Sequence, residues 1–212
     1  MKVICYGDSN TYGFDPRMGS PGRLPREQRW TGILNAMPEF EIVNEGMNGR
    51  TIPTAEAAYR WLGKVINRNR DADALVIMLG TNDMFMVSGA TAGLLAERMR
   101  GTFAKVPELR RFRDAPGKRV FLVSPPPPAL KVLFYQMAGV PVSQKADEVA
   151  RIVAELPAEY ARVAAEENVG VIDAGRWNIE LFYDGLHFSE AGHREFAERM
   201  REELLAGTVP GE

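Results

Sequence analysis

Five short apolar runs recur along the chain, and they predict strands over residues 2–6, 41–45, 74–79, 119–124 and 169–173. Between them, apolar residues repeat every three or four positions, as they do along one face of a helix. The clearest repeats are Leu95, Ala96, Met99, Phe103 and Val106; Val149, Ile152, Val153 and Leu156; and Phe196, Met200 and Leu204. Because strands and helices alternate and the strands are almost continuously apolar, the pattern predicts a parallel sheet with helices on both faces.

The predicted fold class is therefore α/β, a three-layer α/β/α sandwich with a five-stranded parallel sheet. A length of 212 residues suits one such domain, so we expect a single domain over residues 1–212. Pro157 interrupts the helical pattern that begins near residue 144. We expect it to end or kink that helix, or to start a second helix as its first residue.

The first predicted strand ends at Gly7, a residue that tolerates a sharp turn, and Ser9 follows two positions later. Ser9 is therefore expected at the carboxyl edge of the sheet. Open α/β sheets bind ligands at this edge, and the free N–H groups of a following helix can stabilise an oxyanion there. The alternative for a Ser or Asp in this place is a helix N-cap.

Near the other end of the chain, Asp184 precedes His187 by three residues. A hydroxyl nucleophile needs a base whose pKa lies near neutrality and a carboxylate that fixes the tautomer of that base. Ser9, Asp184 and His187 supply these three roles. The alternative for His187 is a polar loop residue before a helix capped by Ser189. The second histidine, His193, lies within that helical pattern and is expected to be structural.

Two further segments end strands with polar turns. Residues 42–51 run from a strand into a turn that bears glycines, and residues 74–83 break at Gly80 and bring Asn82 to the same edge of the sheet. Acyl transfer needs hydrogen-bond donors aimed at the developing oxyanion, and a backbone N–H together with an asparagine amide suit this role.

These segments resemble the GDSL-type or SGNH-type esterase family. The matching blocks are G-D-S-N at 7–10, N-E-G-M-N-G at 44–49, G-T-N-D at 80–83 and D-G-L-H at 184–187. The resemblance implies the flavodoxin-like strand order 2-1-3-4-5. It also implies Ser9 as nucleophile, His187 as base, Asp184 as the group that orients the base, and an oxyanion hole formed by the Ser9 N–H, the Gly49 N–H and the Asn82 side chain.

One residue departs from the family's motif: Asn10 stands where the name-giving G-D-S-L has leucine. Since this position has no role in proton transfer, we expect the chemistry to be unaffected.

Within the family, the stretches at 29–32, 78–83 and 123–127 are similar to the cytoplasmic, oligomeric branch of arylesterases and acyltransferases. That branch handles small acyl esters and can pass the acyl group to alcohols in water. The resemblance places Phe14, Phe85 and Leu186 beside the substrate, where apolar walls would favour a small acyl chain. The alternative for each is an ordinary core residue.

Two long irregular stretches, 14–28 and 125–143, follow the first and fourth strands and are expected to overhang the catalytic edge. The second contains the apolar segment from Leu130 to Met137. Because monomers rarely expose a contiguous apolar patch, this segment and the family resemblance predict a homo-oligomer. The alternative is that the segment folds back onto the core.

The remaining composition narrows the class of protein. A net charge of −2 with both signs interspersed gives no sign of a nucleic-acid or membrane-surface partner. The single cysteine, Cys5, is expected in the core, and the absence of an export signal or a membrane-length apolar run indicates a cytoplasmic protein. Neither histidine has ligands at zinc spacing, so we expect no metal and no cofactor.

The sequence thus predicts a serine esterase that acts on small carboxylic esters through an acyl-enzyme. Open alternatives on the same triad are a carbohydrate O-acetyl esterase, a lysophospholipase or a thioesterase. A non-catalytic binding module is the alternative from a different class.

Overall fold

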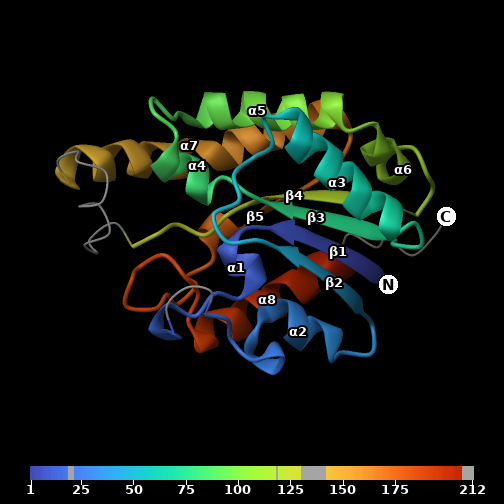
Figure 1. Ribbon diagram of the computed structural model, residues 1–212, viewed down its shortest axis with the longest axis horizontal. Coiled ribbons are helices and arrows are strands. Elements are labelled where there is room, and N and C mark those ends of the chain that lie inside the picture. The colour runs from blue at the N-terminus through green and yellow to red at the C-terminus, as the bar shows by residue number, and fades with distance from the viewer. Residues whose placement is uncertain (19–21, 118, 130–141, 207–212) are drawn as a thin grey trace.

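The computed structural model describes residues 1–18, 22–117, 119–129 and 142–206. Its five strands form one parallel sheet in the order β2-β1-β3-β4-β5 (Figure 1). The strands are β1 (Lys2–Gly7), β2 (Glu41–Gly46), β3 (Ala74–Met78), β4 (Arg119–Ser124) and β5 (Gly170–Asp173). This arrangement confirms the predicted fold class, the strand order and each strand to within one residue at either end.

Helices cover both faces of the sheet. They are α1 (Ser9–Tyr12), α2 (Trp30–Asn35), α3 (Glu56–Arg68), α4 (Thr81–Met86), α5 (Ala92–Lys105), α6 (Arg110–Arg113), α7 (Val142–Glu167) and α8 (Glu190–Ala206). Short 3₁₀ turns occupy Pro16–Met18, Arg26–Gln28, Pro107–Leu109 and Ala174–Arg176. In Figure 1, α3, α5 and α7 lie above the sheet, and α2 and α8 lie below it.

The two faces of the sheet carry separate cores, because successive side chains of a strand point in opposite directions. Ile4 and Leu75 face α3, α5 and α7, whereas Val3 and Val76 face α2 and α8. Cys5 belongs to the second core and is 1% exposed, as predicted. Both faces of the central strands β1, β3 and β4 are thus shielded from water, which explains why these strands are almost continuously apolar, whereas the edge strand β2 carries Glu41, Asn44 and Glu45.

The expectation that Pro157 ends a helix is wrong. Helix α7 runs through this residue to Glu167. Leu156 before the proline and Tyr160 after it are both buried in the same core as α5. Packing along this continuous face offsets the backbone hydrogen bond that a proline cannot donate.

The register of the sheet brings the ends of the central strands level with one another. Gly7 pairs with Gly46 on one side and with Met78 on the other. The segments that follow β1, β2 and β3 therefore leave from one edge, beside the reversal of strand order where open sheets form crevices. Gly46 lets α1 approach, since a Cβ there would lie 2.1 Å from the backbone nitrogen of Tyr12.

Two expectations concern the surface. The apolar segment from Leu130 to Met137 lies outside the described residues, so its packing and the homo-oligomer stay predictions. Among the helices that the structure does describe, none has both the length and the apolar character needed to cross a bilayer.

Candidate active site

Ser9 is the first residue of α1, directly after the turn that ends β1. The N-cap is Asp8, whose carboxylate accepts a hydrogen bond from the Asn10 N–H at 2.9 Å. The capping role considered for this turn therefore belongs to Asp8. Ser9 keeps a backbone N–H that no carbonyl within the helix can accept.

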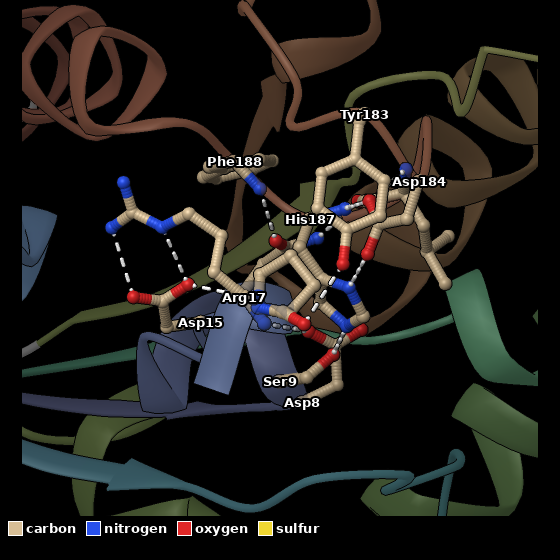
Figure 2. Close-up of polar contacts among 11 residues, drawn as sticks. Asp8, Ser9, Asp15, Arg17, Tyr183, Asp184, His187 and Phe188 are labelled. Carbon is tan, nitrogen blue, oxygen red and sulfur yellow. Dashed lines mark hydrogen bonds and ion pairs between the residues drawn. The ribbon is translucent and has the colours of Figure 1, made fainter. Parts of the chain in front are cut away.

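His187 bridges Ser9 and Asp184, although 178 residues separate it from Ser9 in sequence (Figure 2). Its Nδ1 lies 2.6 Å from Asp184 Oδ2 and its Nε2 lies 3.0 Å from Ser9 Oγ. Since an ionised carboxylate only accepts hydrogen bonds, Nδ1 carries the proton and donates. Nε2 is then the nitrogen that accepts from the Ser9 hydroxyl.

Asp184 is held as an anion within its own loop. Its Oδ1 accepts the backbone N–H groups of Leu186 and His187, each at 3.0 Å. Burial by itself would raise the pKa of this carboxyl, but the hydrogen bonds from the His187 ring and from both backbone N–H groups outweigh it and lower the pKa. The carboxylate stays charged and fixes the orientation of the imidazole.

Asn82 and Gly49 lie on the turns that follow β3 and β2. Asn82 Nδ2 donates to the carbonyl of Arg50 at 3.0 Å, and an amide nitrogen has a second hydrogen to donate. Gly49 is exposed and has a φ of 72°, in the left-handed region that favours glycine. Gly80, with a φ of 127°, makes the turn that begins α4 and carries Asn82.

Arg50 is a buried cation beneath this edge, and the sequence patterns did not single it out. Its Nη1 donates to the carbonyl of Gly7 at 2.9 Å and to that of Glu45, and its guanidinium lies 4.0 Å from the centre of the Tyr6 ring. Arg50 thus ties the turn after β2 to the end of β1.

Asp8, the N-cap of α1, is also buried at this edge and is 1% exposed. Burial raises its pKa to about 6, although the Asn10 N–H, the charge of His187, the Thr81 hydroxyl and Arg50 oppose the rise. Asp8 and Arg50 therefore place opposite charges under the turns that carry Ser9 and Gly49.

The three residues expected at the substrate lie in different surroundings. The Phe14 ring is 4.5 Å from the His187 ring, centre to centre. Leu186 is half-buried next to His187 in sequence. Phe85 is also half-buried and packs against the core shared by α3, α5 and α7. Contact with the site is therefore clearest for Phe14.

His193 is fully buried on α8, where its Nδ1 accepts the backbone N–H of Trp30 at 3.3 Å. This agrees with the structural role expected from its place in the helical pattern. Across the described ranges of the chain, no group of three or more His, Cys, Asp or Glu residues could hold a metal ion.

Ser9, His187 and Asp184 thus form a hydrogen-bonded row at the carboxyl edge of this sheet, where open α/β folds bind their ligands. Residues 5–195 match the sequence profile of the GDSL-like lipase/acylhydrolase family. The chain therefore belongs to this family, as the four blocks predicted.

Solved structures agree with this assignment. Est24, a carbohydrate acetylesterase from Sinorhizobium meliloti, is 27% identical with a TM-score of 0.79, over 97% of this chain and 98% of Est24. The native aryl esterase of M. smegmatis is 26% identical with a TM-score of 0.77, over 97% and 98% of the two chains. No curated protein sequence matches the chain.

Proposed function

We propose that this acylhydrolase is a serine esterase that cleaves small carboxylic esters through an acyl-enzyme on Ser9. The observation that carries the proposal is the continuous hydrogen-bonded row from Ser9 Oγ through the His187 ring to Asp184. Ser9 is only 7% exposed and His187 8% exposed, so the row is largely shielded from water. Such a row activates a hydroxyl that is otherwise a weak nucleophile.

The reaction would proceed in two halves. Ser9 Oγ attacks the ester carbonyl while His187 Nε2 takes its proton, and Asp184 stabilises the imidazolium. His187 then gives this proton to the leaving alkoxide, the bond between the acyl carbon and that oxygen breaks, and the acyl group remains on Ser9. A water molecule repeats the steps in the second half and releases the acid.

Three donors are proposed for the oxyanion: the backbone N–H of Ser9, the backbone N–H of Gly49 and the Asn82 amide. The position of Ser9 at the helix start, the left-handed turn at Gly49 and the second hydrogen of Asn82 Nδ2 support this set. Each donor would strengthen its hydrogen bond as negative charge develops on the carbonyl oxygen.

The substrate class is proposed from apolar groups near the site. Phe14 covers one side of His187, and Phe85 and Leu186 complete the proposed wall. Met47 lies in the turn that carries Gly49, Met86 ends the helix that carries Asn82, and Tyr183 precedes Asp184; all three are exposed. Apolar side chains in or beside the four blocks favour small alkyl and aryl esters.

A carbohydrate O-acetyl esterase is the second candidate, favoured by the similarity to Est24. A sugar would need polar groups to bind its hydroxyls. Rates on acetylated xylose and on phenyl acetate would separate the two, and we expect phenyl acetate to react faster. Passage of the acyl group to an alcohol is also proposed, to be measured as benzyl acetate and phenol formed from phenyl acetate and benzyl alcohol in water.

The direct test of the proposed function compares the wild type with Ser9→Ala and His187→Ala on p-nitrophenyl acetate. Each substitution should lower kcat by roughly a millionfold, because the two side chains act as a unit. A fluorophosphonate probe should label Ser9 in the folded wild type. Wild-type rates in Ser9→Ala would refute Ser9 as the nucleophile, and absence of labelling in the folded wild type would favour a non-catalytic binding module.

The cytoplasmic location and the homo-oligomer remain proposals as well. Light scattering at micromolar concentration tests the second, and a species of the 23.6 kDa chain mass would refute it.

A further inference from the structure

The side chain of Asn10 makes two hydrogen bonds that bracket His187. Its Nδ2 donates to the carbonyl of Leu186 at 3.2 Å, and its Oδ1 accepts the backbone N–H of Phe188 at 2.9 Å. One partner is an acceptor and the other a donor, so the orientation of the amide is determined. Asn10 is 6% exposed, and Phe188 is 1% exposed. These bonds are therefore shielded from competition with water.

Asn10 is itself firmly placed. Its backbone N–H donates to Asp8, and its carbonyl accepts the indole N–H of Trp30 at 3.0 Å. Trp30, the first residue of α2, is completely buried, and its ring lies 5.1 Å from that of Phe196 on α8. Asn10 is also bonded covalently to Ser9, so one residue of α1 carries the nucleophile while the next holds the loop of the base.

The hydrogen bonds of Asp184 do not hold this loop at a fixed distance from Ser9. Asp184 binds the ring of His187 and the backbone of the same loop, so those contacts move with the loop as a whole. They fix the imidazole within the loop but not the distance from the loop to Ser9. At the exposed rim, Tyr183 donates to the carbonyl of Pro16. Asn10, by contrast, ties the loop to α1 in the buried interior.

We propose that Asn10 is a positioning residue that holds His187 within reach of Ser9; this rests on the proposed esterase function. Leucine, which the family's name-giving motif has here, cannot form either bond. It would leave the Leu186 carbonyl and the Phe188 N–H without their partner, and buried backbone groups are costly to leave unpaired. In this chain the Asn10 side chain thus helps to align His187 with Ser9.

The first variant is Asn10→Leu, which gives residues 7–10 of this chain the sequence G-D-S-L. A displacement of about 1 Å at a reacting group can cost on the order of a hundredfold in rate. We expect kcat on p-nitrophenyl acetate to fall roughly ten- to a hundredfold, with KM changed less than about threefold. The rate of fluorophosphonate labelling should fall in parallel. Assays are made well below the melting temperature, so a loss of stability alone leaves these rates unchanged.

The second variant, Asn10→Asp, gives a pH signature. When protonated, the introduced carboxyl can donate to the Leu186 carbonyl and accept from the Phe188 N–H. When ionised, it only accepts and faces the carbonyl with a negative charge. The ratio of its kcat to that of the wild type should therefore fall as pH rises. This variant also serves if Asn10→Leu does not fold.

The matched control is Asn35→Leu. Asn35 Oδ1 accepts the backbone N–H of Ile42 at 2.8 Å, which joins α2 to β2 far along the sheet from Ser9. This variant should melt at a lower temperature and keep the wild-type kcat. A kcat within threefold of the wild type in folded Asn10→Leu, or an Asn10→Asp ratio that does not change with pH, would overturn the positioning role.

Hydrogen–deuterium exchange provides a readout independent of activity. Peptides spanning residues 182–190 should exchange faster in Asn10→Leu than in the wild type, with no change in peptides from β3 and β4. Unchanged exchange in 182–190 would refute the positioning role. If the wild type neither hydrolyses esters nor labels at Ser9, the esterase proposal fails, while the exchange result still decides whether Asn10 holds this loop.

Discussion

The buried imidazole of His193 should make the stability of this protein depend on pH in a defined direction. Burial, with the positive charges of Arg29 and His187 adding to it, lowers the pKa of His193 to about 3 from the usual 6.5. His193→Asn removes the titration but leaves a carbonyl oxygen that can accept the Trp30 N–H. The variant therefore loses a fixed amount of packing at every pH and loses the pH dependence that His193 contributes.

The sign follows from where the proton binds. Between pH 6.5 and about 3 the unfolded chain protonates His193 and the native state does not. The free energy of unfolding therefore falls as pH falls through this window, and the full stability is present only above pH 6.5. At about 1.4 kcal/mol for each pH unit, roughly 2 kcal/mol is lost by pH 5 and roughly 5 kcal/mol by pH 3. These losses are large beside a typical total of about 5–15 kcal/mol.

Asp8 acts in the opposite direction. Its pKa is raised from 3.8 to about 6, so the native state holds a proton that the unfolded chain has released in this window. The free energy of unfolding then falls as pH rises from 3.8 to 6, by roughly 3 kcal/mol. In the wild type the two groups partly cancel, and only comparison of variants separates them.

The assay is urea unfolding followed by tryptophan fluorescence at pH 7, 6 and 5 for the wild type and His193→Asn. At pH 7 the variant should be the less stable protein. Its deficit should shrink by roughly 2 kcal/mol on going to pH 5, because only the wild type loses the contribution of His193. Contributions from all other groups cancel in this difference. A deficit that stays constant from pH 7 to pH 5 would refute the reasoning.

Three further substitutions test other parts of the site. Asn82→Ala should lower kcat on p-nitrophenyl acetate roughly a hundredfold to a thousandfold with little change in KM, and an unchanged kcat would remove it from the oxyanion hole. Phe14→Ala should shift the preferred p-nitrophenyl ester from acetate to longer acyl chains, by on the order of tenfold in relative kcat/KM; an unchanged profile would exclude Phe14 from the wall. Arg50→Met should cost about 1–3 kcal/mol in urea unfolding, because it leaves the carbonyls of Gly7 and Glu45 without their side-chain donor. Arg111→Met, which loses a bond to the carbonyl of Ile66 and one to the exposed Asn67 side chain, both far from the site, should cost less, and equal losses would contradict the role given to Arg50.

The strands of the sheet could be predicted because burial of a strand determines the residue types along that strand itself. Strands buried on both faces must be apolar at nearly every position, so each one appears as a run in the sequence. The course of α7 was not predictable in this way. Pro157 is a local signal against a helix, and only the tertiary packing of Leu156 and Tyr160 on one core offsets it.

The residues proposed as nucleophile, base and orienting carboxylate could be picked out in the sequence for a different reason. Hydroxyl activation requires particular side-chain types, and histidine is rare here, with two in the chain. Once His187 is considered, an aspartate three residues before it and a serine at the end of the first strand leave few other assignments. The distances could not come from the sequence, because 178 residues separate the two partners.

The sequence showed Asn10 only as a departure from the family motif and did not single out Arg50, and the contacts of both escaped it for a common physical reason. Both act through hydrogen bonds to backbone groups, at Leu186 and Phe188 for Asn10 and at Gly7 and Glu45 for Arg50. Every residue except proline offers the same backbone donor and acceptor, so such partners leave no characteristic residue type or spacing. Side-chain chemistry thus allows a nucleophile and a base to be proposed from the sequence alone. The residues that hold them at bonding distance, which bond to the backbone of distant segments, become visible only in the folded structure.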